Sequence, residues 1–217
     1  MPDYAAQRLN MVESQVRTND VPEPRIQAAM AEIPRERFVP AAKRAVAYAD
    51  VAVEVVQGRF LLEPRTLAKL LRLAEIGPED HVLDVGCTTG YATAVLSRLA
   101  GKVTGLEVDA DLVRVASEML PAVGASNASV VQGSLTDGHL AGAPYDVILI
   151  EGAVETVPEA VLAQLAEGGR LVTVVRQDGQ SRAHVYLRSA GHFGDRPDFD
   201  AAAPILPGFR KAVGFVF

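Results

Sequence analysis

The feature that most constrains this chain is an alternation, from residue 81 onward, of strand-sized apolar runs with amphipathic helical stretches. Such alternation is typical of βαβ units, in which helices join parallel strands and cover the sheet. Because no helix-length segment separates the last two expected strands, we expect the final strand to be antiparallel. The expected strands are residues 81–85, 102–107, 129–132, 146–150, 169–175, 184–188 and 211–217, and the expected helices are residues 91–100, 111–120 and 158–166.

Residues 1–75 have a different pattern from the rest of the chain. Apolar side chains recur at spacings of three and four after Tyr4, after Pro24 and after Pro64, as on one face of a helix. We therefore expect a mostly helical amino-terminal extension, residues 1–75, and an α/β core, residues 76–217, in one compact unit. Two roles are open to the extension: it could cover a ligand pocket or mediate a dimer.

Composition excludes several classes of protein. The 217 residues include 21 Lys and Arg against 27 Asp and Glu, and this net charge of −6 disfavours a nucleic-acid binder. The single cysteine, Cys87, cannot form an intrachain disulfide, and the four histidines lack the spacing of metal ligands. The sequence contains no membrane-spanning apolar run and no signal-peptide pattern. We therefore expect a cytoplasmic protein without a metal and without nucleic-acid or membrane partners.

A glycine-bearing turn follows the strand at residues 81–85 and leads into a helix. At the carboxyl end of such a strand, glycine allows a nucleotide-like ligand to approach the backbone, although similar turns also occur without ligands. Glu107 ends the next strand, 21 positions after Gly86, which is close to the roughly 20-residue offset of a ribose-binding carboxylate. The turn and Glu107 together favour a nucleotide site. Asp109 is expected to cap the helix that follows.

The turn does not have the dinucleotide-binding pattern. It reads G-C-T-T-G from Gly86, without a middle glycine, and Asp84 would repel a pyrophosphate. A carboxylate there suits a ligand with an ammonium group, such as S-adenosylmethionine, whose adenosine would meet Glu107. The turn resembles the acid-x-G-x-G-x-G motif of class I S-adenosylmethionine-dependent methyltransferases, and NAD-dependent oxidoreduction is disfavoured. Asp84, Gly86, Cys87, Thr88, Gly90 and Glu107 are the candidate cofactor-binding residues, with Cys87 a small turn residue rather than a nucleophile.

A more specific resemblance extends over most of the chain. It is carried by residues 11–17 (MVESQVR), 33–40 (IPRERFVP), 47–50 (AYAD), 144–146 (PYD), 165–171 (LAEGGRL) and 204–209 (PILPGF). In order and spacing these segments resemble the protein-L-isoaspartate O-methyltransferase family. The resemblance implies a Rossmann-like core with a helical amino-terminal extension, and methyl transfer to the α-carboxylate of isoaspartyl residues in proteins or peptides. The family's G-D-G after the third strand appears here as Gly133-Ser134-Leu135, which adds Ser134 and Leu135 to the cofactor candidates.

The acceptor loop departs from the family. Its usual G-x-T-I-S-Q-P-Y corresponds to residues 58–65, where Phe60 and Leu62 replace the two hydroxyl side chains. Glu63 replaces an amide with a charge that would repel a carboxylate. The loop therefore puts the isoaspartyl acceptor in question, and three acceptors are open: an isoaspartyl protein or peptide, another protein group, or a small molecule. The alternative is a cofactor-binding or interaction protein of the same fold that has lost methyl transfer.

Two acidic residues are candidate catalytic groups, Glu151 and Glu63. Glu151 follows the fourth strand and could act as a general base toward a hydroxyl or amine, with its pKa raised by burial and by Glu63 if the two approach. Equally, Glu151 could cap a loop or be solvated. Arg59 and Arg65 could bind an anionic acceptor, or they could be exposed loop residues.

Overall fold

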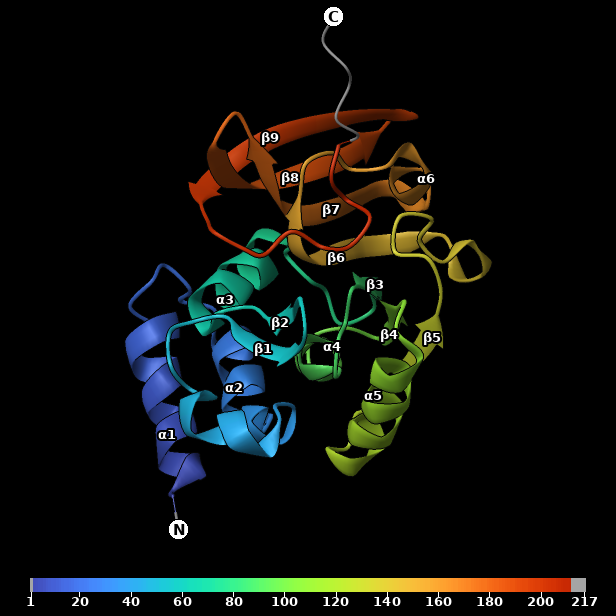
Figure 1. Cartoon of the computed structure of the whole chain (residues 1–217). Helices are drawn as coiled ribbons and strands as arrows, with labels where there is room; N and C mark the ends of the chain where they lie inside the picture. Colours follow the sequence, from blue (N-terminus) through green and yellow to red (C-terminus); the bar gives the residue numbers. More distant parts are fainter. Residues whose placement is uncertain (1, 212–217) are drawn as a thin grey trace, which may run out of the picture.

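The computed structural model describes residues 2–211 and contains a seven-stranded sheet in the order β5-β4-β3-β6-β7-β8-β9 (Figure 1). The first five strands in this order, from β5 through β4, β3 and β6 to β7, pair in parallel. Strand β8 pairs antiparallel with β7, and β9 pairs antiparallel with β8. The strands are β3 His81–Val85, β4 Lys102–Glu107, β5 Ala128–Gln132, β6 Tyr145–Val154, β7 Leu165–Gln177, β8 Gln180–Ser189 and β9 His192–Asp200. The predicted α/β fold with a mostly parallel sheet and an antiparallel edge is confirmed.

The parallel strands are apolar because both of their faces are covered. Four of the five residues of β3 are buried, and all of β6 is buried except Asp146. Such strands form near-continuous apolar runs rather than alternating patterns. Helices α4 Tyr91–Leu96, α5 Ala110–Ala122 and α6 Glu159–Leu162 connect them. Asp109 caps α5 as predicted, accepting hydrogen bonds from the backbone N–H groups of Asp111 and Leu112.

The amino-terminal extension contains both helices and a hairpin. Its helices are α1 Tyr4–Met11, continued by a π-helical turn Val12–Val16, then α2 Pro24–Glu32 and α3 Pro64–Leu73, with 3-10 turns at Arg35–Arg37 and Ala41–Val46. The antiparallel hairpin of β1 Val53–Val56 and β2 Arg59–Leu61 was not predicted. It forms where β-branched residues meet Gly58, whose φ of 74° suits a tight turn. The division at residue 75 stays a prediction.

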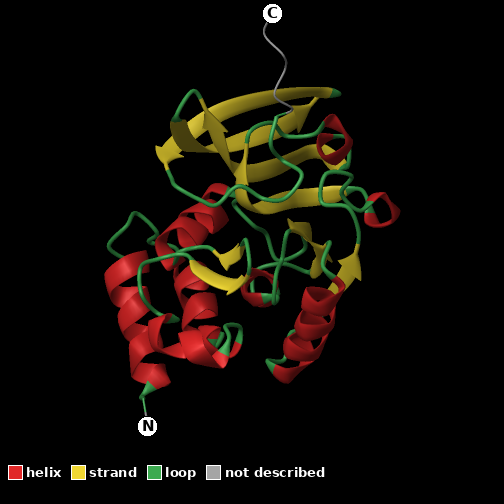
Figure 2. Cartoon of the chain, in the orientation of Figure 1, coloured by secondary structure: helices red, strands yellow, loops and turns green. Residues whose placement is uncertain are grey.

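Several boundaries differ from those expected. Helix α4 ends at Leu96, four residues earlier than expected. Helix α6 has only four residues, because β7 already begins at Leu165. The expected strand at residues 211–217 lies almost wholly outside the described residues, and β9 is the last described strand. Figure 2 shows most of the helices gathered around the β3–β5 part of the sheet, whereas the short α6 and helix α3 lie against β7.

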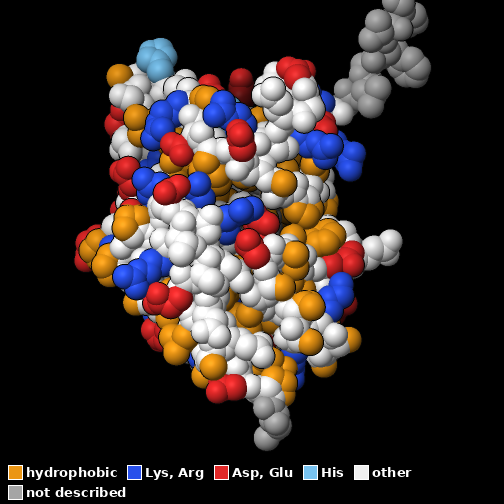
Figure 3. All heavy atoms as spheres, turned by 90° about the vertical axis from the view of Figure 1, so that its left-hand side faces the viewer, with side chains coloured by type: hydrophobic (Ala, Val, Ile, Leu, Met, Phe, Trp, Pro, Cys, Tyr) orange, Lys and Arg blue, Asp and Glu red, His pale blue; other side chains and the backbone are white. Residues whose placement is uncertain are grey.

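The surface and helices add two further observations. Among the described residues, none of the helices combines the length and apolar character needed to cross a bilayer. On the face shown in Figure 3, acidic and basic side chains are interspersed with apolar ones.

Candidate functional site

The candidate site lies where the order of the sheet reverses, at the carboxyl ends of β3, β4 and β6. Strand β3 pairs with β4 on one side and with β6 on the other: the chain runs outward from β3 to β4 and β5 and then crosses back to β6. Ligands of doubly wound sheets bind in the crevice at such a point. The topology brings Asp84 on β3, Glu107 on β4 and Glu151 on β6 to this edge, and all three are buried. Glu151 lies within β6, which continues to Val154, and does not follow the strand as expected. These acidic residues are far apart in sequence and become neighbours only through strand order.

The turn after β3 combines two glycines with one strained threonine. Gly86 has a φ of 82° and Gly90 a φ of 89°, conformations that glycine adopts without cost. A Cβ on Gly90 would lie 3.2 Å from the Ala116 side chain, so glycine also allows α4 to pack against α5. Thr88 has a φ of 50° although it is β-branched, and it is fully buried. This backbone stores strain at the predicted cofactor turn.

Glu107 is saturated with hydrogen bonds from the protein itself. Arg59 from β2 donates to both carboxylate oxygens, from Nη1 to Oε1 at 2.5 Å and from Nη2 to Oε2 at 2.6 Å. The backbone N–H of Thr88 donates to Oε2 at 2.9 Å, and those of Val108 and Asp109 donate to Oε1. Arg59 is 5% exposed and Glu107 0%. Arg59 is therefore a buried partner of Glu107, and neither an exposed loop residue nor a free anion binder.

Asp84 and Glu151 form a second buried pair. Glu151 is 2% exposed, and burial together with the Asp84 charge raises its pKa well above the ordinary value. Burial also raises the pKa of Asp84, to about 6, while hydrogen bonds from Thr93 and Glu151 oppose this shift. The Thr93 hydroxyl donates to Asp84 Oδ2 at 2.6 Å. Asp84 Oδ1 and Glu151 Oε1 are both buried without a hydrogen-bond partner in the described structure. Glu63 is not among the groups that shift the pKa of Glu151.

The acceptor loop is packed into the protein interior. Leu62 is buried, Phe60 is half-buried, and the Leu62 carbonyl accepts a 2.7 Å hydrogen bond from Arg35 Nη2. Arg35 is itself fully buried; its Nε donates to the Ala47 carbonyl at 2.7 Å. Glu63 precedes α3 and accepts a hydrogen bond from the Thr66 hydroxyl. The half-exposed Arg65 also pairs with Glu63 at 3.3 Å, so Glu63 has two local partners at the start of a helix.

The remaining predicted residues surround the same edge. Ser134 is exposed and its hydroxyl bonds to that of Thr136 at 3.1 Å, whereas Leu135 is buried. Cys87 is buried, and burial raises the pKa of its thiol, so the group is neutral. Leu206, from the segment 204–209, lies over the turn, with its Cδ1 3.1 Å from where a Cβ on Gly86 would be. A backbone hydrogen bond from Leu206 to the Ala153 carbonyl fixes this segment against β6.

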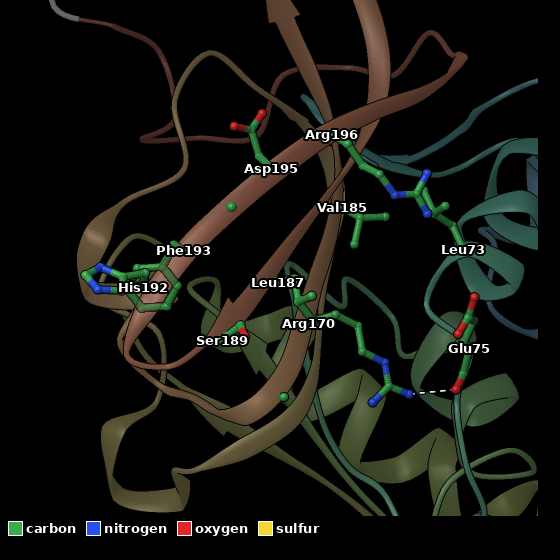
Figure 4. A pocket seen from close by; sticks show the side chains of 12 residues that line it. Leu73, Glu75, Arg170, Val185, Leu187, Ser189, His192, Phe193, Asp195 and Arg196 are labelled. Carbon is green, nitrogen blue, oxygen red and sulfur yellow. Dashed lines mark hydrogen bonds between the residues drawn. The ribbon is translucent and has the colours of Figure 1, made fainter.

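A surface hollow of about 790 Å³ lies elsewhere, between the end of α3 and the β8–β9 strands (Figure 4). Arg170 projects into it and donates to the Glu75 carbonyl at 2.6 Å. None of the residues that line it is a predicted site residue. Among the described residues, no three His, Cys, Asp or Glu side chains are grouped as metal ligands would be. The chemistry-bearing residues thus remain those at the β3, β4 and β6 ends.

The fold and this edge define a Rossmann-like protein of the class I methyltransferase type. A solved protein-L-isoaspartate O-methyltransferase superposes with a TM-score of 0.81 at 22% identity, covering 94% of this chain and 66% of that chain. A Plasmodium falciparum structure, described as a protein-L-isoaspartate O-methyltransferase in complex with S-adenosyl-L-homocysteine, gives a TM-score of 0.80 at 20% identity, covering 92% and 97%. At these identities the likeness establishes the fold.

Sequence comparison establishes the family. The family profile described as Protein-L-isoaspartate(D-aspartate) O-methyltransferase matches residues 6–197. A protein-L-isoaspartate O-methyltransferase of Koribacter versatilis is 39% identical over 87% of this chain and 85% of its own, and one from Methanoregula boonei is 38% identical over 78% of each. The chain belongs to the protein-L-isoaspartate O-methyltransferase family. The predicted class, a methyltransferase of the S-adenosylmethionine-dependent type, is confirmed at that level.

The ribose side of the described site does not fit the cofactor of this family. Asp84, Gly86 and Glu107 lie at the expected edge, but both oxygens of Glu107 already accept hydrogen bonds from the protein. Leu206 and Arg59 occupy the space beside Gly86 that glycine leaves open. The ribose of S-adenosylmethionine and the Arg59 guanidinium would therefore need the same Glu107 carboxylate.

Proposed function

We propose that this chain is a methyltransferase whose acceptor group is an uncharged nucleophile, such as a neutral amine, and that it does not methylate isoaspartyl carboxylates. The observation that carries the proposal is the acceptor loop, where Phe60 and Leu62 stand at the positions of the family's hydroxyls. Leu62 is buried, so its side chain belongs to the core. A carboxylate acceptor would meet no hydroxyl from these two positions.

The charges near the loop support the same proposal. Glu63 follows Leu62 in the loop, and its carboxylate, which pairs with Arg65 at 3.3 Å, adds negative charge that disfavours an anionic acceptor. The two buried arginines of this region are already engaged: Arg59 pairs with Glu107, and Arg35 donates to backbone carbonyls. An amine or hydroxyl acceptor avoids this unfavourable electrostatic environment. Burial and the Asp84 charge raise the pKa of Glu151, which disfavours the ionised form that a general base needs.

The test is transfer of labelled methyl from S-adenosylmethionine to a defined isoaspartyl peptide, beside an extract of the source cells. We expect label in the extract and none on the peptide. Label on the peptide at the rate of a family member with the hydroxyl loop would contradict the proposal. The matching gain-of-function variant is Phe60→Thr with Leu62→Ser, which should begin to label the peptide.

A second candidate function is favoured by one contact. Because Arg59 holds Glu107, a protein of this family that has lost transfer and acts through binding alone would have the same structure. Absence of label in both the peptide and the extract, from a folded protein, would favour this second function over the first.

A further inference from the structure

The carboxylate of Glu107 has no capacity left for a ribose. A carboxylate offers about four lone-pair sites, and Glu107 receives bonds from two Arg59 nitrogens and from the N–H groups of Thr88, Val108 and Asp109. The three backbone donors come from the turn and from the end of β4, which are fixed parts of the fold. The two side-chain donors come from Arg59 alone, so Arg59 is the partner that a ligand could replace.

Arg59 also reaches the second wall of the crevice. Its Nη2 atom donates to the Gly86 carbonyl at 3.3 Å, and it would lie 3.6 Å from a Cβ on Gly86. The guanidinium therefore spans from the end of β4 to the turn after β3. In sheets of this topology, that crevice is where the sugar of a nucleotide ligand lies. Arg59 thus pairs with the carboxylate that a ribose would bind, and it fills the space that the ribose would occupy.

The contact is specific to arginine. A guanidinium presents two parallel N–H donors to a carboxylate, whereas a lysine ammonium presents one compact charge. Arg59 Nε has no partner in the described structure, so the residue is held here through its two terminal nitrogens. Its backbone is anchored by the β1–β2 pairing, where Arg59 lies opposite Val56. The hairpin therefore delivers the guanidinium to Glu107.

We propose that Arg59 is an internal competitor of the ribose of S-adenosylmethionine, which closes the cofactor site by pairing with Glu107. Cofactor affinity is then set by the free energy of releasing Arg59. This inference concerns the cofactor site and is separate from the identity of the acceptor. A chain that binds the cofactor analogue without transferring methyl would contradict the proposed function and leave this inference intact.

The test is calorimetric titration of the wild type, Arg59→Ala and Arg59→Lys with S-adenosyl-L-homocysteine. We expect Arg59→Ala to bind at least about tenfold more tightly than the wild type, since the competing pair is gone. Arg59→Lys should fall between the two. The matched control is Arg17→Ala, an exposed arginine paired with Glu13, which should leave affinity unchanged.

A second ligand separates competition from a general loosening of the structure. The gain in affinity should disappear for a 2′,3′-dideoxy analogue of S-adenosyl-L-homocysteine, which has no hydroxyls to place on Glu107. Equal affinity of the wild type and Arg59→Ala, or an equal gain for the dideoxy analogue, would overturn the proposal. If Arg59→Ala does not fold, judged by circular dichroism, Arg59→Lys decides: unchanged or weaker binding by a folded Lys variant would overturn the proposal.

Discussion

The cofactor turn and the acceptor loop have diverged to different extents from the family pattern. The turn keeps Asp84, Gly86 and Gly90, with Glu107 at the end of the next strand, whereas the loop carries Phe60, Leu62 and Glu63 where the resemblance implies two hydroxyls and an amide. The structure shows that these regions are not independent, because Arg59 of the loop hairpin pairs with Glu107. Retention of a binding motif therefore does not by itself leave the site open, since a neighbouring side chain can occupy it.

The largest expected effect comes from breaking the contact between the two regions. Arg59→Ala leaves Glu107 buried without a cationic partner, and we expect a loss of about 3–5 kcal/mol in unfolding free energy, measured by urea denaturation. Added S-adenosyl-L-homocysteine should recover part of this loss by binding the folded state. A loss below about 1 kcal/mol would show that the pair does not hold the hairpin.

The position of the acceptor loop depends on the buried Arg35. Arg35→Met keeps most of the side-chain volume but leaves the buried carbonyls of Ala47 and Leu62 without this donor. We expect a loss of about 3 kcal/mol in unfolding free energy, whereas Arg17→Met at the exposed control position should stay within about 0.5 kcal/mol. Similar values for the two variants would mean that the loop is held by other contacts.

The buried carboxyl groups of Asp84 and Glu151, beside the cofactor turn, make the unfolding free energy depend on pH. The folded-state pKa values of Glu151 and Asp84 are raised, so the folded chain binds protons more tightly than the unfolded chain. The stabilisation that comes from this tighter proton binding is fully present below the pKa values of the unfolded chain, near 4. It is lost as the pH rises through about 6 and beyond. Unfolding free energy should fall from pH 5 to pH 8, with a contribution of up to about 1.4 kcal/mol per pH unit for each proton.

Glu151→Gln should flatten this pH dependence, because a glutamine amide donates to Asp84 at every pH. Urea denaturation at pH 5 and pH 8 compares it with the wild type and with Glu118→Gln, an exposed helix position. A wild-type slope in the Glu151→Gln variant would show that the two carboxyl groups do not share a proton.

The smallest expected effect concerns the strained threonine. Thr88→Gly removes a β-branched side chain from the left-handed region, and we expect a gain of about 1 kcal/mol in unfolding free energy. Thr89→Gly is the contrast, because Thr89 donates its hydroxyl to the Phe38 carbonyl and should lose stability when replaced. Destabilisation in both variants would argue against strain at Thr88.

Local patterns in the sequence predicted the parallel sheet, the cap at Asp109 and the positions of Asp84 and Glu107. These features depend on periodicity and on turns between neighbouring elements. The β1–β2 hairpin was missed because its strands are short, and β9 was missed because its residues are mostly exposed and lack an apolar run. The Arg59–Glu107 pair joins residues 48 positions apart and leaves no local signal. Likewise, only strand order brings Glu151 to Asp84.

The most direct test of the account is a crystal structure of the wild type with S-adenosyl-L-homocysteine soaked or co-crystallised at saturating concentration. We predict that the ribose hydroxyls bind Glu107 and that the Arg59 guanidinium has left both carboxylate oxygens. A complex in which the ligand occupies the crevice while Arg59 keeps both hydrogen bonds to Glu107 would contradict the claim that Arg59 closes the cofactor site.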